Sequence, residues 1–267
     1  MGFEELYQDL ERFRPPADLV DNVVVVERVG STNLLARRIV GEYAAQELVV
    51  PEYLLVAGEQ REGRGRQGRS WASPPGAGVY ATLVIHRQSP EQCARLPLQV
   101  AVGLVEALDD VLPPSTCRLE WPNDLVTETG KLGGILIETL ALPDEGRRVA
   151  LVGFGINRGL GPGDADLPAA GATSLWRELG HEPPSLGELT WKLVRSVHRE
   201  IRAPEARGGD LVDRYRKLSV HEPGQKLTCR LGDETLEGTF RGFDERGFLR
   251  LEQHGRVRTV ATGEVLE

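Results

Sequence analysis

The chain has 267 residues and a formal net charge of −8, and its three cysteines, Cys93, Cys117 and Cys229, are far apart. An odd number of cysteines without a Cys-x-x-Cys pair argues against both a disulfide framework and a zinc site. The negative charge argues against a broad nucleic-acid surface, which needs many cations facing phosphates. Apolar runs fall far short of the roughly 18 residues of a membrane span, and the acidic start of the chain is unlike a secretory signal. We therefore expect a cytoplasmic protein that binds neither membrane nor nucleic acid.

Helices and strands alternate in the first part of the chain. The expected elements are, in chain order, a helix at 4–13, a strand at 23–26, a helix at 33–43, strands at 54–57 and 79–85, and a helix at 90–112. Ser31 or Thr32 can cap the second of these helices. About twenty residues rich in glycine and arginine join the strands at 54–57 and 79–85, and loops of that length are often functional.

The second part of the chain is rich in predicted strands. The expected elements are strands at 118–121, 131–139 and 148–156, helices at 186–201 and 210–218, and short strands at 226–231, 235–241, 248–252 and 257–261. Together they predict an α/β (α+β) catalytic domain over residues 1–219, with a mixed, largely antiparallel sheet and helices on one face. Residues 220–267 are predicted to form a small β-barrel, which is too short to be stable alone and should pack on the larger domain.

The long loop contains the motif Gly63-Arg64-Gly65-Arg66-Gln67-Gly68. It matches the G-x-G-x-x-G of dinucleotide-binding turns, but Pro74-Pro75-Gly76 follow too closely for a helix that could receive pyrophosphate. The Gly-Lys-Ser or Gly-Lys-Thr of a P-loop is also absent. Three glycines and the charges of Arg64, Arg66 and Arg69 suit a loop that folds over an acyl phosphate, and repulsion among the arginines predicts disorder until an anion binds. Alone, the motif fits a solvated loop or an arginine-glycine tract on nucleic acid better.

Lysine is rare in this chain, since only four of the 32 basic residues are lysines. One of them, Lys131, begins a predicted strand of leucine, glycine and isoleucine, and strict alternation would place it on one face with Gly133, Ile135 and Ile137. A lysine in such a strand is costly to desolvate unless an anion meets it, and the glycines leave room for a ligand. This pattern favours a ligand site over a lysine that reaches solvent at a sheet edge.

Polar residues also follow two other predicted strands. Pro122 favours an extended Trp121, and the turn formers Asn123 and Asp124 come next. Asn157 ends the glycine-containing strand that includes Gly153 and Gly155. Each pattern alone also fits an ordinary structure, a hairpin turn with an aromatic anchor in the first case and a packed core strand in the second.

Taken together, these segments resemble the biotin protein ligase family. The matching stretches follow the family's order and are Ser31-Thr32-Asn33, Gln60 with Gly63 to Gly68, Arg69-x-Trp71-x-Ser73-Pro74, Trp121-Pro122-Asn123-Asp124, Lys131-Leu132-x-Gly134-Ile135-Leu136-x-Glu138 and Gly153-x-Gly155-Ile156-Asn157. The resemblance covers roughly residues 23–157, and the C-terminal strands fit the small SH3-like domain of the family. Because the motifs begin at Ser31, we expect the short form of the family, without an N-terminal DNA-binding domain and without sequence-specific DNA binding.

The resemblance implies an ATP-dependent ligase with a two-step reaction. The carboxylate of biotin would attack the α-phosphorus of ATP bound with Mg²⁺ and expel pyrophosphate. The resulting biotinyl-5′-adenylate would then acylate a lysine of a biotin carboxyl carrier protein and release AMP. Cations near the α-phosphate would stabilise the charge that develops on its oxygens. The implied partners are biotin, ATP and the carrier protein, and the protein would be a monomer or a homodimer.

The resemblance also assigns residues to this reaction. Lys131 and Arg66 would be catalytic. The biotin site would contain Ser31, Thr32, Asn33, Gln60, Arg64, Gly65, Arg66, Lys131, Gly133 and Gly134. The ATP and adenylate site would contain Arg64, Arg66, Arg69, Trp71, Asn123, Asp124, Lys131 and Asn157. No metal ligand is assigned, although Asp124 could either contact magnesium or orient the incoming lysine.

Glu120 departs from the family pattern. Family members commonly have a lysine directly before Trp-Pro-Asn-Asp, where this chain has Glu120. Either Arg118 replaces that lysine or the affinity for ATP is reduced.

Two alternatives to a biotin ligase stay open. One is a lipoate-type acyl ligase, which shares the architecture and adenylate chemistry but not the Gly-Arg-Gly-Arg-x-Gly loop, and the other is a non-catalytic biotin-binding regulator.

Overall fold

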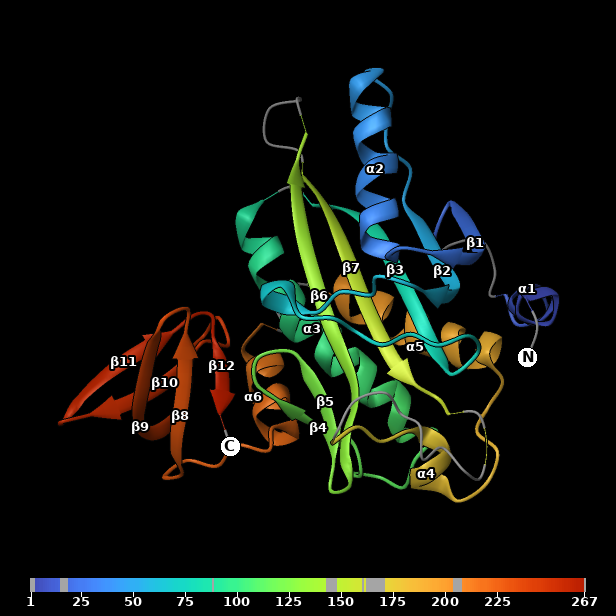
Figure 1. Ribbon diagram of the computed structural model, residues 1–267. Coiled ribbons are helices and arrows are strands. Elements are labelled where there is room, and N and C mark those ends of the chain that lie inside the picture. Colours follow the sequence, from blue (N-terminus) through green and yellow to red (C-terminus); the bar gives the residue numbers. More distant parts are fainter. Residues whose placement is uncertain are drawn as a thin grey trace.

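The computed structural model describes residues 3–14, 19–87, 89–142, 148–159, 161, 171–203 and 208–266. These residues form two β-sheets, one of seven and one of five strands, together with helices (Figure 1). The strand order of the larger sheet is β1-β2-β3-β7-β6-β5-β4. Within it β1 and β2 pair in parallel, and the other described neighbours pair antiparallel. The mixed, largely antiparallel sheet predicted from the sequence is confirmed.

The elements of the main domain lie close to the predicted ones. The strands are β1 (Asn22–Val29), β2 (Tyr53–Gln60), β3 (Gly78–Arg87), β4 (Arg118–Glu120), β5 (Asp124–Thr127), β6 (Gly130–Ala141) and β7 (Arg148–Asn157). The helices are α1 (Phe3–Arg12), α2 (Thr32–Ala45), α3 (Pro90–Asp109), α4 (Leu175–Leu179), α5 (Leu186–Arg202) and α6 (Gly208–Leu218). Strand β5 and helix α4 were not predicted, because four or five residues carry too little periodicity to be recognised.

Helices pack on both faces of the large sheet. Leu54 and Val56 of β2 belong to the core that the sheet forms with α3 and α5. Leu55, which points to the other face, packs with Ala36 and Val40 of α2. The prediction of helices on one face is confirmed for α3 and α5, and α2 is added on the opposite face, where it lies in front of the sheet in Figure 1.

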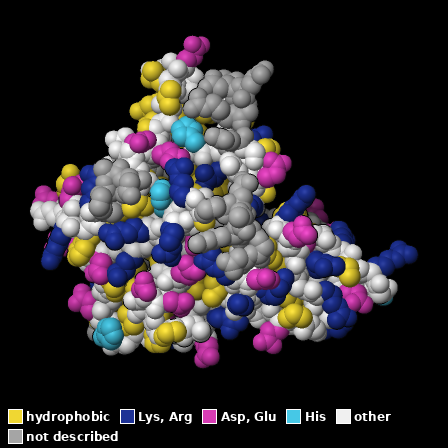
Figure 2. Space-filling model, turned by 180° about the vertical axis from the view of Figure 1, so that it is seen from behind, with side chains coloured by type: hydrophobic (Ala, Val, Ile, Leu, Met, Phe, Trp, Pro, Cys, Tyr) yellow, Lys and Arg dark blue, Asp and Glu magenta, His cyan; other side chains and the backbone are white. Residues whose placement is uncertain are grey.

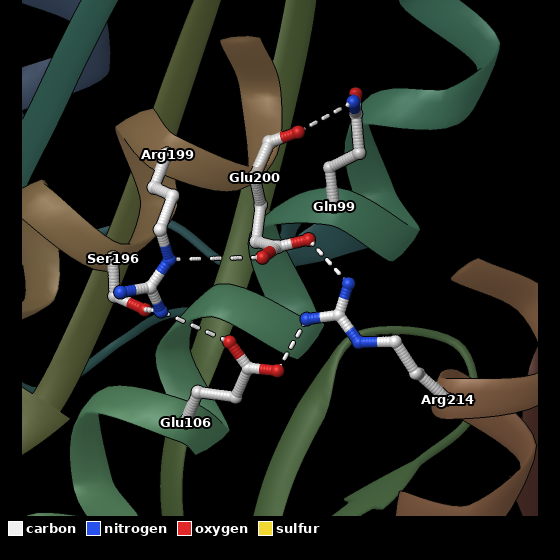
Figure 3. A network of polar contacts seen from close by, with 6 residues as sticks. All are labelled: Gln99, Glu106, Ser196, Arg199, Glu200 and Arg214. Atoms are coloured by element: carbon white, nitrogen blue, oxygen red, sulfur yellow. Dashed lines mark hydrogen bonds and ion pairs between the residues drawn. The ribbon is translucent and has the colours of Figure 1, made fainter. Parts of the chain in front are cut away.

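A network of charged side chains connects α6 to α3 and α5 (Figure 3). Glu200 of α5 is only 5% exposed, and its carboxylate accepts a hydrogen bond of 2.8 Å from Arg214 of α6. Arg214 also pairs with Glu106 of α3, which accepts a second hydrogen bond of 3.0 Å from Arg199. Gln99 of α3 donates to the backbone carbonyl of Glu200 at 2.9 Å. Because a buried carboxylate is stable only when it is paired, the network holds α6, the last helix before the smaller sheet.

The smaller sheet is antiparallel and packs beside α6 (Figure 1). Its strands are β8 (Lys226–Leu231), β9 (Glu234–Phe243), β10 (Leu249–Gln253), β11 (Arg256–Val260) and β12 (Glu264–Leu266), in the order β11-β10-β9-β8-β12. Among the described strands no pairing between β11 and β12 closes this sheet. The predicted small SH3-like domain is confirmed as an antiparallel sheet, and its described strands do not close into a barrel. Strand lengths and glycines in a sequence do not show which edges pair.

The smaller sheet shares its core with the main domain. Tyr215 of α6 packs edge-on against Phe243 of β9, with 5.1 Å between the ring centroids, and Phe240 is fully buried in the same cluster. The predicted packing of the C-terminal strands on the larger domain is thus confirmed. A domain boundary between residues 219 and 220 stays a prediction.

The described surface carries both signs of charge, and the cysteines are not bonded to one another. On the face drawn in Figure 2, acidic and basic side chains of the described residues are intermixed over both sheets. Cys93, Cys117 and Cys229 are free thiols, and the last two are buried. No helix within the described ranges is both long and apolar enough to cross a membrane.

Candidate functional site

A pocket of about 220 Å³ lies on the α2 side of the large sheet, where β6 and β7 are neighbours. The loop between β2 and β3, residues 61–77, crosses in front of these strands in Figure 1 and is called the arginine loop below. Most of the predicted site residues line the pocket: Ser31, Thr32, Asn33, Gln60, Arg64, Gly65, Arg66, Arg69, Trp71, Asn123, Asp124, Lys131, Gly134 and Asn157. The fold thus gathers segments that are far apart in the sequence.

Glycines form the floor of the pocket. Gly134 of β6 pairs with Gly155 of β7, and a Cβ at Gly155 would lie only 2.5 Å from Nε1 of Trp71. A Cβ at Gly153, two residues earlier on β7, would overlap Oδ1 of Asn33. The indole of Trp71 and the amide of Asn33 therefore rest directly on the strand backbone, which only glycine allows.

A bulge changes the predicted face of Lys131. Leu125 of β5 pairs with Gly133, but the next pair on β5 already involves Lys131, so one residue of β6 is skipped. Such an extra residue turns the following side chain to the other face. Lys131 therefore lies on the pocket face with Gly134, whereas a Cβ at Gly133 would point toward the core and meet Ile156 at 2.6 Å. The predicted alternation was wrong, and Gly133 is not among the described residues that line the pocket.

The charge of Lys131 is held inside the pocket by two groups. Its ammonium group donates a hydrogen bond to Oδ2 of Asp124 and lies 5.5 Å from the centroid of a ring of Trp71. A cation is attracted both by the carboxylate and by the negative face of the indole. The second carboxylate oxygen of Asp124, Oδ1, is buried and has no hydrogen-bond partner among the described residues. Asp124 can therefore accept one further donor or cation.

The first turn of α2 is hydrogen-bonded to the start of the arginine loop. Gln60 accepts hydrogen bonds from the backbone N–H and the hydroxyl of Thr32, at 2.8 and 3.1 Å. The amide nitrogen of Gln60 donates to Ser73 at 2.9 Å. Ser73 is only 4% exposed. It belongs to the motif Arg69-x-Trp71-x-Ser73-Pro74, but the sequence predicted no role for it. The hydroxyl of Ser31, at the N-cap of α2, makes no capping hydrogen bond.

Asn33 uses its whole side-chain amide within the protein. Its nitrogen donates to the carbonyl of Leu136 at 3.1 Å and to the carboxylate of Glu138 at 3.0 Å. Its oxygen accepts a hydrogen bond of 2.7 Å from Thr82. These partners hold α2 against β6 and β3. Because both polar atoms are engaged, the geometry fits Asn33 as a wall of the pocket better than as a donor and acceptor for a ligand.

The arginine loop has the shape of a hairpin. The backbone N–H of Trp71 donates to Gly63, and that of Gly65 donates to Arg69, both at 2.7 Å. Left-handed φ angles of 54° at Gln67 and 75° at Gly68 turn the chain at the tip, residues 65–69, which includes the short 3-10 turn η1 (Arg66–Gly68). The expectation that the loop is disordered until an anion binds stays a prediction.

Carboxylates and hydrogen-bond acceptors surround the arginines at the tip. Arg66 donates to Oδ1 of Asn123 at 3.2 Å and to the hydroxyl of Thr262 at 2.7 Å. Arg69 forms an ion pair with Glu264. Burial lowers the pKa of Arg66, with the positive charge of Arg69 acting in the same direction and the negative charge of Asp124 opposing it. Arginine nevertheless stays charged at neutral pH, so the tip presents fixed positive charge to the pocket.

Arg118 does not replace the lysine that Glu120 displaces. The guanidinium group of Arg118 donates to the carbonyls of Leu218 and Ser219 and so anchors the chain that leads into the smaller sheet. Glu120 lies directly opposite Asp124 in the β4–β5 hairpin. Neither Arg118 nor Glu120 is among the described residues that line the pocket.

His221 is a residue near the site that the sequence did not reveal. Its Nε2 accepts a hydrogen bond of 3.1 Å from the backbone N–H of Trp121, and the peptide between Trp121 and Pro122 is cis. Burial lowers the pKa of His221 to about 4. A neutral imidazole therefore supports the turn that presents Asn123 and Asp124 to the pocket, and no local motif could have indicated a partner 100 residues away.

Comparisons with known proteins agree with the ordered motifs. Residues 25–157 match the Biotin/lipoate A/B protein ligase family, and residues 224–266 match the Biotin protein ligase C terminal domain. The chain is 32% identical to the biotin–[acetyl-CoA-carboxylase] ligase of Mycobacterium tuberculosis, over 97% of this chain and 98% of that protein. The chain belongs to the biotin protein ligase family. The bifunctional ligase/repressor BirA of Salmonella typhimurium, another biotin protein ligase relative, is 30% identical over 91% of this chain and 73% of its own length.

Solved structures of biotin protein ligases have the same fold. The ligase of Aquifex aeolicus in complex with biotin and ATP superposes with a TM-score of 0.67 and 23% identity, over 92% of this chain and 97% of that one. The ligase of Leishmania major in complex with biotin gives a TM-score of 0.59 and 24% identity, over 95% and 99% of the two chains. At these identities the likeness concerns the fold.

Proposed function

We propose that this protein is an ATP-dependent biotin protein ligase. It forms biotinyl-5′-adenylate from biotin and ATP and transfers biotin to a lysine of a biotin carboxyl carrier protein. The observation that carries this proposal is the position of Lys131, which lies on a glycine floor beneath the arginine loop. The supporting comparison is the near full-length identity of 32% with a biotin–[acetyl-CoA-carboxylase] ligase.

The α2 end of the pocket suits the head group of biotin. A ureido ring carries two N–H donors and a carbonyl acceptor, and its bicyclic frame is otherwise apolar. Ser31 offers a hydroxyl that caps nothing, and Thr32 and Gln60 place further polar atoms beside it. The glycines at 153 and 155 let Asn33 and Trp71 lie against the strand and form the walls of this end. We assign this end of the pocket to biotin.

The Lys131 end of the pocket suits the reacting carboxylate and the α-phosphate. The attack of one anion on another requires fixed positive charge that offsets their repulsion. Lys131 provides it from the sheet, and Arg64, Arg66 and Arg69 provide it from the loop. Trp71 covers this end, so the loop also shields the mixed anhydride from water, which would otherwise hydrolyse it.

Asp124 is the residue that would hold a magnesium ion. Mg²⁺ is usually bound by one or two carboxylates together with the phosphates of the nucleotide, and the unpaired, buried Oδ1 of Asp124 fits that role. The ion would neutralise the charge of the phosphates, which the carboxylate of Asp124 would otherwise repel. No group of three candidate ligands among His, Cys, Asp and Glu occurs in the described part of the chain, which suits an ion that arrives with ATP.

The proposal also covers the location, the oligomeric state and the partners of the enzyme, and the two alternative functions. We place it in the cytoplasm, as a monomer or a homodimer that acts on the carrier protein and not on nucleic acid. A lipoate-type ligase is disfavoured because Arg64, Gly65 and Arg66 of the Gly63–Gly68 motif line the pocket and the relatives bear the names of biotin ligases. A non-catalytic regulator is disfavoured because Lys131 and the loop arginines are all present at the pocket.

Incubation with biotin, MgATP and an apo carrier domain, followed by intact-mass measurement, tests the proposal. We expect the carrier to gain one biotinyl group, and we expect no gain without ATP. Lipoate in place of biotin is the control for acyl specificity. Absence of biotin-dependent exchange between pyrophosphate and ATP would refute adenylation, and modification by lipoate alone would show the related ligase instead. Biotin binding without exchange would show a regulator.

A further inference from the structure

The smaller sheet reaches the tip of the arginine loop through two residues. The carboxylate of Glu264, the first residue of β12, pairs with Arg69 through Oε1 and with Arg230 of β8 through Oε2. Thr262, two residues earlier, accepts a hydrogen bond of 2.7 Å from Arg66. Arg66 and Arg69, the two arginines of the tip, line the pocket and are therefore also bound to the C-terminal end of the chain.

We propose that Glu264 and Thr262 are positioning residues for adenylation, which hold the tip of the arginine loop over the nucleotide end of the pocket. The proposal rests on the proposed function, because it concerns the same reaction. Neither residue is among the described residues that line the pocket around Lys131. Both act through the arginines, so their effect should appear in the binding of ATP.

Glu264 is well placed to act as a fixed support. It pairs in register with Arg230 of β8, so the sheet holds its backbone. Gly263 passes so close to β8 that a Cβ would lie 2.8 Å from the carbonyl of Arg230, which brings the carboxylate near that strand. The side chain of Glu264 is 20% exposed, compared with 50% for Arg69. The rigid partner is thus the carboxylate, and the partner that gains order is the loop arginine.

Charge also favours this arrangement. Hydrogen bonding from Arg230 and the positive charges of Arg69 and Arg230 lower the pKa of Glu264, so the group stays ionised at neutral pH. An ionised Glu264 offsets the mutual repulsion of the arginines at the tip. Without it, Arg69 and the nearby Arg66 would repel each other in a partly buried place, and the loop would pay conformational entropy each time a nucleotide binds.

The two ends of the arginine loop are held by different parts of the protein. Gln60 and Ser73 hold its base against α2, beside the proposed biotin site. Thr262 and Glu264 hold its tip, beside the proposed phosphate site. Loss of the tip contacts should therefore weaken ATP binding and leave biotin binding unchanged. A general loss of stability would not weaken the binding of ATP while leaving the binding of biotin unchanged.

The experiment compares Glu264→Gln and Thr262→Val with the matched control Glu234→Gln. Glu234 pairs with Arg258 in the same sheet and takes no described part in the loop. For each variant we would measure the KM for ATP and kcat in biotin-dependent pyrophosphate exchange, the Kd for biotin, and the rate of tryptic cleavage within residues 64–69. We expect E264Q to raise the KM for ATP about two- to fivefold, the effect of one partly exposed ion pair. Its kcat and biotin Kd should stay within about twofold, and cleavage at the tip should accelerate.

Each result decides the proposal. An unchanged KM for ATP in both E264Q and T262V would overturn it, and a lower KM would do the same, since it would show that the contacts compete with the nucleotide. An equal effect of E234Q would also overturn it. If E264Q fails to fold, T262V provides the test, because it removes one hydroxyl and no charge. Absence of exchange in the wild type would refute the proposed function, while unchanged cleavage rates would refute the support of the tip separately.

Discussion

Acidification should destabilise the folded protein through His221. The imidazole of this residue is 5% exposed and accepts a hydrogen bond from the N–H of Trp121 through Nε2. Its other nitrogen, Nδ1, is buried and has no hydrogen-bond partner among the described residues. Protonation would place a charge where the backbone of Trp121 offers a donor and no acceptor. Burial accordingly lowers the pKa of His221 from 6.5 to about 4.

The size and sign of the effect follow from linkage. Between pH 6.5 and about 4 the unfolded chain binds the proton and the folded protein does not, so the free energy of unfolding decreases as the pH falls. The loss is absent above pH 6.5 and complete below about 4, where both states are protonated. Each pKa unit corresponds to about 1.4 kcal/mol, so the full loss from this one residue is about 3 kcal/mol.

Urea unfolding of the wild type and of His221→Gln at pH 7, 5.5 and 4 measures this effect. Glutamine can accept the same hydrogen bond but does not titrate, so the stability of the variant should fall less steeply with pH. We expect the difference between the two proteins to change by about 3 kcal/mol from pH 7 to pH 4. His254→Gln, at an exposed histidine, should follow the wild type. Parallel pH profiles for the wild type and H221Q would refute the reasoning, whatever the offset between them.

Three further predictions follow from the site and the core. Lys131→Ala should reduce the rate of biotin-dependent pyrophosphate exchange about 100-fold, while calorimetry should still detect bound biotin. Gly155→Ala should displace Trp71, since the new Cβ would lie 2.5 Å from its Nε1, and should weaken adenylate binding by about 1–3 kcal/mol. Arg214→Ala leaves the buried carboxylate of Glu200 without its closest partner and should lower the free energy of unfolding by about 3–5 kcal/mol. Adding Glu200→Gln should recover part of that loss.

The fold was largely predictable because its strands and helices are long and regular. Runs such as Val23 to Val26 and Ala81 to Ile85 are strands, half-buried in the first case and buried in the second, and their apolar side chains alternate between the two cores of the sheet. Strand β5 was missed because it has four residues and includes polar ones. The turn at 128–130 joins β5 to β6, a connection that the predicted strands did not include. The bulge that turns Lys131 toward the pocket depends on that unrecognised partner strand.

The site was predictable as a set of motifs but not as a set of contacts. The order of the motifs brought together residues that the fold then gathered around one pocket. The partners that hold those residues could not be inferred, because each pair spans a large part of the chain. Asn33 is bound by Thr82 and Glu138, and Arg69 is bound by Glu264. Which side chains meet at such separations depends on the topology of the fold, and local sequence motifs do not indicate it.

Glu120 increases the importance of the loop arginines in this chain. The resemblance to the family led us to expect a lysine before Trp-Pro-Asn-Asp, and this chain has there a carboxylate directly opposite Asp124. Arg118 is turned away and bound to the chain at residues 218 and 219. Among the described residues that line the pocket, the positive charge comes from Lys131 and from Arg64, Arg66 and Arg69 of the arginine loop. At the tip of that loop, Arg66 and Arg69 contact Thr262 and Glu264 near the C-terminal end of the chain, so the loss of these contacts is expected to weaken nucleotide binding.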